Sequence, residues 1–234
     1  MQHPKATERN VNVRKMKWYS LIDKVYRVEN LESAWKQVKA NRGAAGVDGV
    51  TIKDFGKDLH GNIEKLSLDM RTNSYVPKPV RRVEIKKDTG GIRPLGIPSI
   101  RDRVAQQSAR NVLEPIFEPK FLDCSFGFRP GRSAHMAIER IKLFLEAGYV
   151  WVVDADIKGY FDNISQEKLI DEVAKEVSDG SMLKLIRSFL QSGVMVNGTF
   201  ELTDKGTPQG GLCKALHNPP YAKKVIMQSK LLKY

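Results

Sequence analysis

Residues 149–157 have the sequence Tyr-Val-Trp-Val-Val-Asp-Ala-Asp-Ile, and this stretch decides how the rest of the chain is interpreted. Five apolar residues in a row, followed by acidic ones, are typical of a buried strand whose end reaches a functional site. Asp154 and Asp156 lie two residues apart, so both side chains would point to one face of that strand. We therefore predict a buried strand over 149–157 with carboxylates at its end.

The acidic residues at this strand end have two alternative roles. Mg²⁺ prefers carboxylate and carbonyl oxygens, and the turn at 158–161 would leave such groups accessible. Asp162 follows that turn. In the other interpretation, Asp154 or Asp162 only caps the turn or the next helix. Spacing alone leaves both roles open.

Upstream of this strand, residues 82–97 have the pattern of a β-hairpin. Strand-like alternation over 82–86 and an extended stretch over 92–97 flank the turn sequence Asp-Thr-Gly-Gly at 88–91. Prolines at 94 and 98 limit how regular the second strand can be. Lys and Arg side chains near the turn can hold phosphate oxygens, although a hairpin that only presents solvated charges is the alternative.

Helices and a second hairpin account for most of the remaining chain. Apolar spacing and capping residues predict helices over about 18–25, 31–40 after a cap at Asn30, 51–68 from a capping box of Thr51 and Asp54, 99–114, 134–146, 166–177 and 182–191. Asn197-Gly198 predicts a tight turn in a hairpin over 193–202. The Gly-Thr-Pro-Gln-Gly-Gly stretch at 206–211 lacks a following Gly-Lys-Ser/Thr, so it is a loop and not a P-loop.

The composition indicates a basic globular protein. The 234 residues include 39 Lys+Arg and 27 Asp+Glu, giving a formal charge of +12, and 41% are hydrophobic. Residues 1–110 hold 23 basic and 12 acidic side chains, residues 111–213 hold 11 and 15, and residues 214–234 hold five Lys and no acid. A basic half of this kind favours a polyanionic partner such as nucleic acid, although a merely basic protein is the alternative.

The same composition excludes several other classes. No apolar run approaches the ~20 residues of a membrane span, so we predict no membrane insertion. Two cysteines, Cys124 and Cys213, provide neither a disulfide framework nor a zinc set. We therefore expect a reduced, cytoplasmic protein, and the sequence makes no prediction about its oligomeric state.

Five short motifs occur in a fixed order along the chain. The motifs are Gly-Val-Asp-Gly at 46–49, Arg-Pro-Leu-Gly-Ile-Pro at 93–98, Gly-Phe-Arg-Pro-Gly-Arg-Ser-Ala-His at 127–135, Asp-Ile-Lys-Gly-Tyr-Phe-Asp at 156–162 and Gly-Thr-Pro-Gln-Gly-Gly at 206–211. Together they resemble the reverse-transcriptase domain of bacterial group II intron-encoded proteins, the reverse transcriptase/maturase family. Each motif alone is weak, whereas all five in order are specific.

This resemblance implies an α+β fold with right-hand polymerase-like fingers and a partial palm, that is, an incomplete reverse-transcriptase domain. The implied regions are a basic N-terminal helical extension over 1–40, fingers over 41–150, a partial palm over 151–211 and a divergent basic tail over 212–234. The implied activity is that of an RNA-directed DNA polymerase. Its partners would be group II intron RNA or another RNA template, a DNA primer and deoxynucleotides.

The resemblance also implies a set of site residues and a Mg²⁺ cofactor. Asp156 matches the first catalytic, metal-binding aspartate, and the backbone carbonyl of Ile157 matches a second metal ligand. Lys87 and Arg93 match residues that grip the triphosphate, although Lys86 stands where the family has a proline, so the lysine assignment can shift by one. Phe161 matches a residue that excludes a ribose 2′-hydroxyl, with a core phenylalanine as the alternative. Gln209 matches a residue that packs beside the incoming nucleotide and the template.

The match ends after residue 211. The family continues with a Ser-Pro-Leu-Leu-like helix and later a Tyr-x-Asp-Asp motif, whereas this chain has no adjacent Asp-Asp pair anywhere. We therefore expect a truncated reverse transcriptase that is inactive alone, with a frameshifted tail or a genuine divergence as the cause. The alternative functions are a non-catalytic module that binds structured intron RNA, and a product that folds poorly.

Overall fold

The computed structural model describes residues 17–86, 90–155, 163–203 and 205–206. It combines helices with one small sheet, which confirms the predicted α+β class. The elements, in chain order, are α1 (Ile22–Val25), α2 (Val28–Ala40), α3 (Ile52–Lys57), α4 (Leu59–Arg71), β1 (Val80–Lys86), β2 (Ile92–Ile97), α5 (Ile100–Phe117), the 3-10 helix η1 (Glu118–Lys120), α6 (Ala134–Glu146), α8 (Gln166–Ala174), α9 (Gly180–Leu190), β3 (Val194–Val196) and β4 (Thr199–Glu201).

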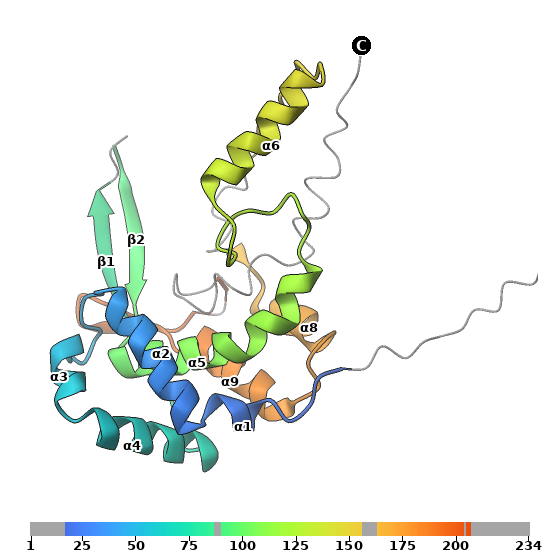
Figure 1. Cartoon of the computed structure of the whole chain (residues 1–234). Coiled ribbons are helices and arrows are strands. Elements are labelled where there is room, and N and C mark those ends of the chain that lie inside the picture. Colours follow the sequence, from blue (N-terminus) through green and yellow to red (C-terminus); the bar gives the residue numbers. More distant parts are fainter. Residues whose placement is uncertain (1–16, 87–89, 156–162, 204, 207–234) are drawn as a thin grey trace, which may run out of the picture.

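Most helices share one apolar core, with α5 in its middle (Figure 1). Side chains from distant parts of the chain meet there, because Leu31 of α2, Leu66 of α4, Ile100 of α5 and Ile186 of α9 are all completely buried. The core therefore joins the predicted fingers to the predicted palm, and we call the helices α1, α2, α4, α5, α8 and α9 the helical body. The division of the chain into fingers and palm stays a prediction.

The sheet has the strand order β2-β1-β3-β4. β1 and β2 form the predicted antiparallel hairpin, and β1 pairs in parallel with β3 through Val80 and Val194. β2 is an edge strand, which is where a sheet tolerates Pro94, because this residue has no N–H to donate. Asn197 and Gly198 have φ angles of 49° and 85°, and they form the predicted tight turn between β3 and β4.

Local capping chemistry sets several helix starts where the sequence predicts them. The side chain of Thr51 and that of Asp54 form a complete capping box at α3. Ser99 accepts a hydrogen bond from the backbone N–H of Asp102 at the start of α5, and Ser133 caps α6 in the same way. These interactions need only three or four adjacent residues, so the sequence alone predicts them well.

Three helix predictions were wrong in their details. Asn30 does not cap α2 but lies inside it, and its side-chain amide donates to the carbonyls of Lys24 and Ser108. The predicted helix over 51–68 is two helices, separated where Asp58 caps α4. α5 continues through Pro115 to Phe117, because only one backbone hydrogen bond is lost when a proline lies near a helix end.

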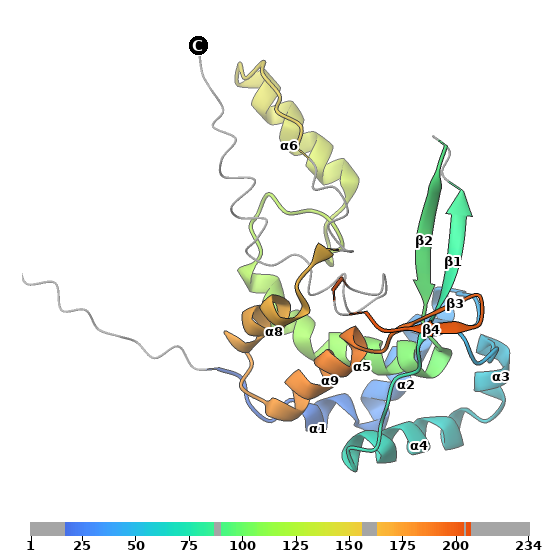
Figure 2. The ribbon, with the colours of Figure 1, turned by 180° about the vertical axis from the view of Figure 1, so that it is seen from behind.

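The predicted buried strand was wrong over residues 149–155. These residues form neither strand nor helix, and the side chains of Val150, Trp151, Val152 and Val153 are 69–76% exposed. A strand needs a hydrogen-bonded neighbour, and no strand in the described part of the chain pairs with this stretch. α6, which precedes it, projects from the helical body in both views and buries none of its residues (Figures 1 and 2). Residues 156 and 157 lie outside the described residues.

Candidate functional site

Two segments that the sequence analysis linked to catalysis are joined at their ends. Ser165 and Lys205 form an antiparallel bridge, and the backbone N–H of Gly206 donates to the carbonyl of Ile164 at 2.8 Å. Ile164 comes two residues after the acidic motif at 156–162, and Gly206 opens the motif at 206–211. The fold thus joins residues 164–165, which follow the first motif, to residues 205–206 at the start of the second, although about forty residues separate them in the sequence.

A buried glutamine stabilises this junction. Gln166 is only 7% exposed, and its side-chain Nε2 lies within hydrogen-bond distance of the carbonyls of Leu190, Thr203 and Gly206 at 3.1, 3.2 and 3.2 Å. These contacts tie the start of α8 to the end of α9 and to the segment after β4. Gly206 itself has a φ of 76°, a left-handed conformation that favours glycine. The sequence analysis missed Gln166, because a glutamine at a helix start shows no sign of burial.

The base of the β1–β2 hairpin is anchored on a buried carboxylate. Asp102 of α5 is 1% exposed, and its oxygens accept hydrogen bonds from Tyr75 Oη at 2.6 Å, from Ser99 Oγ at 2.7 Å and from the backbone N–H of Lys78 at 3.0 Å. Burial raises the pKa of Asp102, and these hydrogen bonds oppose that change. Burial and the adjacent Asp102 charge also raise the pKa of Tyr75 well above its ordinary value. The network holds the chain that enters β1 against α5.

Two arginines gather beside this anchor, under the loop that precedes α3. Arg81 Nη2 donates to the carbonyl of Ala45 at 2.8 Å, and Arg103 donates to the carbonyls of Ala44 and Pro98. Burial lowers the pKa of Arg103, and the positive charge of Arg81 lowers it further, while Asp48 acts in the opposite direction. The Arg81 Nε atom is buried and has no hydrogen-bond acceptor among the described residues. The pair is thus a concentration of positive charge that favours an anion.

A close backbone approach keeps this loop in place. A Cβ atom on Gly46 would lie 2.6 Å from the Cα and backbone N of Ser99, so only glycine fits against the start of α5. The first glycine of the Gly-Val-Asp-Gly motif at 46–49 is therefore required by packing against α5. This close packing brings the backbone carbonyls of the loop within hydrogen-bond reach of Arg81 and Arg103. Asp48 of the same motif pairs with Lys78 at 3.1 Å.

Comparison with known proteins gives the family. The family model "Reverse transcriptase (RNA-dependent DNA polymerase)" matches residues 85–222, which is more than half of the chain. The chain belongs to the reverse transcriptase family. Within that family it is a relative of group II intron-encoded proteins, as the sequence motifs predicted.

The relatives that match this chain include longer proteins. Group II intron-encoded protein LtrA of Lactococcus lactis subsp. cremoris is 40% identical over 186 residues, which cover 78% of this chain and 30% of LtrA. Protein YkfC of Escherichia coli is 35% identical over 202 residues, which cover 84% of this chain and 53% of YkfC. The solved partial Cas6-RT-Cas1–Cas2 complex has the same fold, with a TM-score of 0.58 at 20% identity over 87% of this chain and 34% of that one. The chain thus spans about a third of LtrA and about half of YkfC.

Most of the residues predicted to bind the nucleotide or the metal lie outside the described residues. This applies to Lys87, Asp156, Ile157, Phe161 and Gln209, whose predicted roles stay predictions. The backbone of Arg93 lies in β2, paired with Ile85, so this residue belongs to the hairpin as predicted. Asp154 is exposed and outside any regular element. Among the described residues, no three His, Cys, Asp or Glu side chains gather as metal ligands would.

Arg129, from the Gly-Phe-Arg-Pro-Gly-Arg motif, has a structural position in the fold. It is 9% exposed and pairs with Glu118 at 2.8 Å. Its Nη1 also donates to the carbonyls of Leu122 and Ser125 at 2.7 and 2.9 Å. The guanidinium group of Arg129 thus stabilises the loop between η1 and α6 through these contacts.

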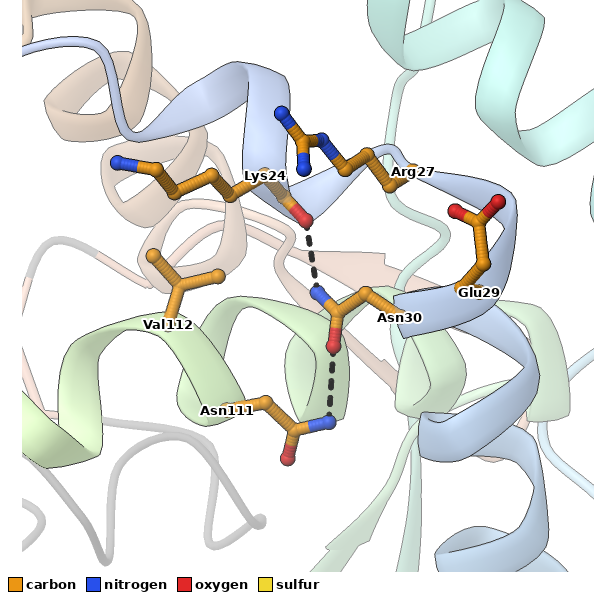
Figure 3. A pocket seen from close by; sticks show the side chains of 6 residues that line it. All are labelled: Lys24, Arg27, Glu29, Asn30, Asn111 and Val112. Atoms are coloured by element: carbon orange, nitrogen blue, oxygen red, sulfur yellow. Dashed lines mark hydrogen bonds between the residues drawn. The ribbon is translucent and has the colours of Figure 1, made fainter.

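A hollow of about 720 Å³ lies between the α1–α2 turn and α5 (Figure 3). Its polar side chains already join these elements, because Asn30 donates to the Lys24 carbonyl at 3.0 Å and accepts from Asn111 Nδ2 at 3.0 Å. Arg27 lies near Asp23 at 3.6 Å, and Glu29 adds another negative charge to the wall. We therefore interpret this hollow as a packing feature.

No described helix combines the length and apolar character needed to cross a membrane.

Proposed function

We propose that this chain provides the RNA-holding fingers and the first metal-binding aspartate of an RNA-directed DNA polymerase of the group II intron type. The observation that carries the proposal is the junction of Ile164 with Gly206, because Ile164 follows Asp156 by eight residues and Gly206 precedes Gln209 by three. An active site for nucleotide addition needs a metal-binding carboxylate and nucleotide contacts in one place.

In this proposal the metal is Mg²⁺, held by the carboxylate of Asp156 and the backbone carbonyl of Ile157. Both are hard oxygen donors of the type that Mg²⁺ prefers, so the donor set fits. When bound, the ion would polarise phosphate oxygens and lower the pKa of an attacking hydroxyl. The chain itself would orient the nucleotide: Lys87 and Arg93 grip the triphosphate, Phe161 excludes the ribose 2′-hydroxyl, and Gln209 packs beside the base.

We further propose that the chain does not extend a primer by itself. Two-metal catalysis needs more than one carboxylate, and the sequence contains no adjacent Asp-Asp pair to supply the others. The test is primer extension with purified chain, an RNA template, a DNA primer, deoxynucleotides and Mg²⁺. We expect no product. Extension that disappears in the Asp156→Asn variant would overturn this part of the proposal and leave the polymerase assignment standing.

A second candidate function is a non-catalytic RNA-binding module. The observation in its favour is the arginine pair of Arg81 and Arg103, which concentrates positive charge at the hairpin base. Binding of structured RNA through phosphates should weaken steeply with salt, with a slope proportional to the number of phosphates contacted. RNA binding without extension favours the module. The absence of RNA binding would contradict both functions.

A further inference from the structure

A second hollow, of about 550 Å³, lies beside the Ile164–Gly206 junction. The start of α8, the end of α9 and the segment after β4 form its wall, which includes Arg187 of α9 and Gln191 directly after this helix. Thr203 and Lys205 line the wall from the segment after β4. The side chains of Arg187, Gln191 and Lys205 are exposed, so a large partner can reach them.

The charges on this wall do not balance. Arg187 and Lys205 both face the hollow, and neither forms an ion pair with an acidic side chain in the described part of the chain. Glu167 is the acidic residue of the wall. Among the described residues of the wall, positive side chains therefore outnumber negative ones, and the N-terminal end of α8 adds its partial positive charge. Two like charges on one wall are stabilised when an anion lies between them.

The wall is also preorganised. The hydrogen bonds of Gln166 to the carbonyls of Leu190 and Thr203 hold the two sides of the hollow together. Arg187 lies one helical turn before Leu190, and Lys205 lies two residues after Thr203. Both cations therefore project from backbone that is already fixed, so less conformational entropy is lost when a ligand binds.

We propose that this hollow binds a backbone phosphate of RNA. Arginine can hold two phosphate oxygens at once and lysine adds a point charge, while an amide and a hydroxyl such as those of Gln191 and Thr203 commonly contact phosphate or sugar. The inference rests on the proposed function, in which the chain binds RNA. It adds a contact point on α8 and α9, separate from the hairpin and from the arginine pair.

The experiment measures RNA binding by fluorescence anisotropy as a function of salt, with the full chain and a labelled RNA hairpin. The test variant combines Arg187→Gln with Lys205→Gln. The matched control combines Lys168→Gln with Lys184→Gln, which removes two exposed cations from α8 and α9 outside the hollow. A third variant, Arg187→Lys with Lys205→Arg, keeps both charges. Thermal unfolding checks that all variants are folded.

The test variant should bind RNA about tenfold more weakly, and its plot of log affinity against log salt should flatten by about one unit for each phosphate contact that is lost. The control and the charge-preserving variant should bind like the wild type. Equal binding by the test variant and the control would overturn the site and leave RNA binding intact. Failure of the wild type to bind RNA would overturn the proposed function and this inference together. Weakened binding of free nucleoside triphosphate, with unchanged RNA binding, would also overturn the assignment to RNA.

Discussion

The helical body and the projecting arm, which we define as residues 134–155, place their apolar side chains in opposite environments. In the helical body, residues such as Leu31, Leu66 and Ile186 are completely buried. In the arm, α6 buries none of its residues, and Ile138 and Trp151 are 63% and 69% exposed. The difference shows that an apolar side chain is stabilised by burial, but that it becomes buried only when another element of the fold packs against it.

The exposed apolar surface of the arm is unusual for a globular protein. Large contiguous apolar patches mark interaction sites or aggregation-prone surfaces. The large apolar side chains of the arm that are at least half exposed are Ile138, Ile141, Leu143, Val150, Trp151, Val152 and Val153. The contrast between body and arm leads to four predictions, which run from the largest expected effect to the smallest.

Removal of a core side chain should have the largest effect on stability. The Ile186→Ala variant leaves a cavity in the shared core, and we expect a loss of about 2–5 kcal/mol in the free energy of unfolding. The matched control is Ile141→Ala in the arm, where the side chain is 55% exposed and the loss should be below about 0.5 kcal/mol. Urea denaturation measures both values. Similar losses in the two variants would show that the arm is packed in solution.

Loss of the buried amide at the junction should have the next largest effect. The Gln166→Ala variant leaves the carbonyls of Leu190, Thr203 and Gly206 without their donor, and we expect a destabilisation of about 1–3 kcal/mol. Hydrogen exchange should also accelerate at the Gly206 N–H, which bonds to Ile164. Glu167→Ala, one residue further on and exposed, is the control. Unchanged exchange at Gly206 would contradict the role of Gln166.

A pH-dependent contribution should come from Asp179, which joins the start of α1 to α9. Burial raises the pKa of Asp179, but hydrogen bonds from the backbone N–H groups of Ile22, Met182 and Leu21 outweigh it, so folding lowers this pKa from 3.8. The stabilisation is therefore complete above the unfolded value and is lost as the pH falls through the folded pKa.

The Asp179→Asn variant removes this titration. Asparagine also caps helices, so we expect a difference from the wild type below about 1 kcal/mol at neutral pH. Because only the wild type loses the contribution of the carboxylate in acid, the difference should shrink below about pH 4. Urea denaturation between neutral and acidic pH measures it. A difference that grows on acidification would refute the proposed sign.

Polar substitution in the arm should have the smallest effect on stability. The double variant Val150→Ser with Val152→Ser changes two side chains that are 76% and 75% exposed, so unfolding should shift by less than about 0.5 kcal/mol. Fluorescence of a dye that binds exposed apolar surface should fall in the same variant. A destabilisation above about 1 kcal/mol, or unchanged dye binding, would mean that these side chains are covered in solution.

The sequence predicted those features that depend on a few adjacent residues. The capping box at Thr51, the side-chain cap at Ser99 and the turn at Asn197 lie where their residue types require, because each is set by hydrogen bonds within one or two turns of chain. The motif order also predicted the family. The catalytic and nucleotide-binding roles of Asp156, Lys87 and their partners stay predictions from resemblance.

Only the tertiary structure decided the features that depend on a distant partner. The strand predicted over 149–157 needed a neighbouring strand, and Gln166 and Asp102 became buried anchors because backbone groups from other segments lie around them. Pro94 is tolerated because β2 is an edge strand of the sheet. The sequence of β2 does not indicate that this strand lies at an edge. The physical reason is that local hydrogen bonds are set by neighbours in the chain, whereas burial and strand pairing are set by what lies opposite in space.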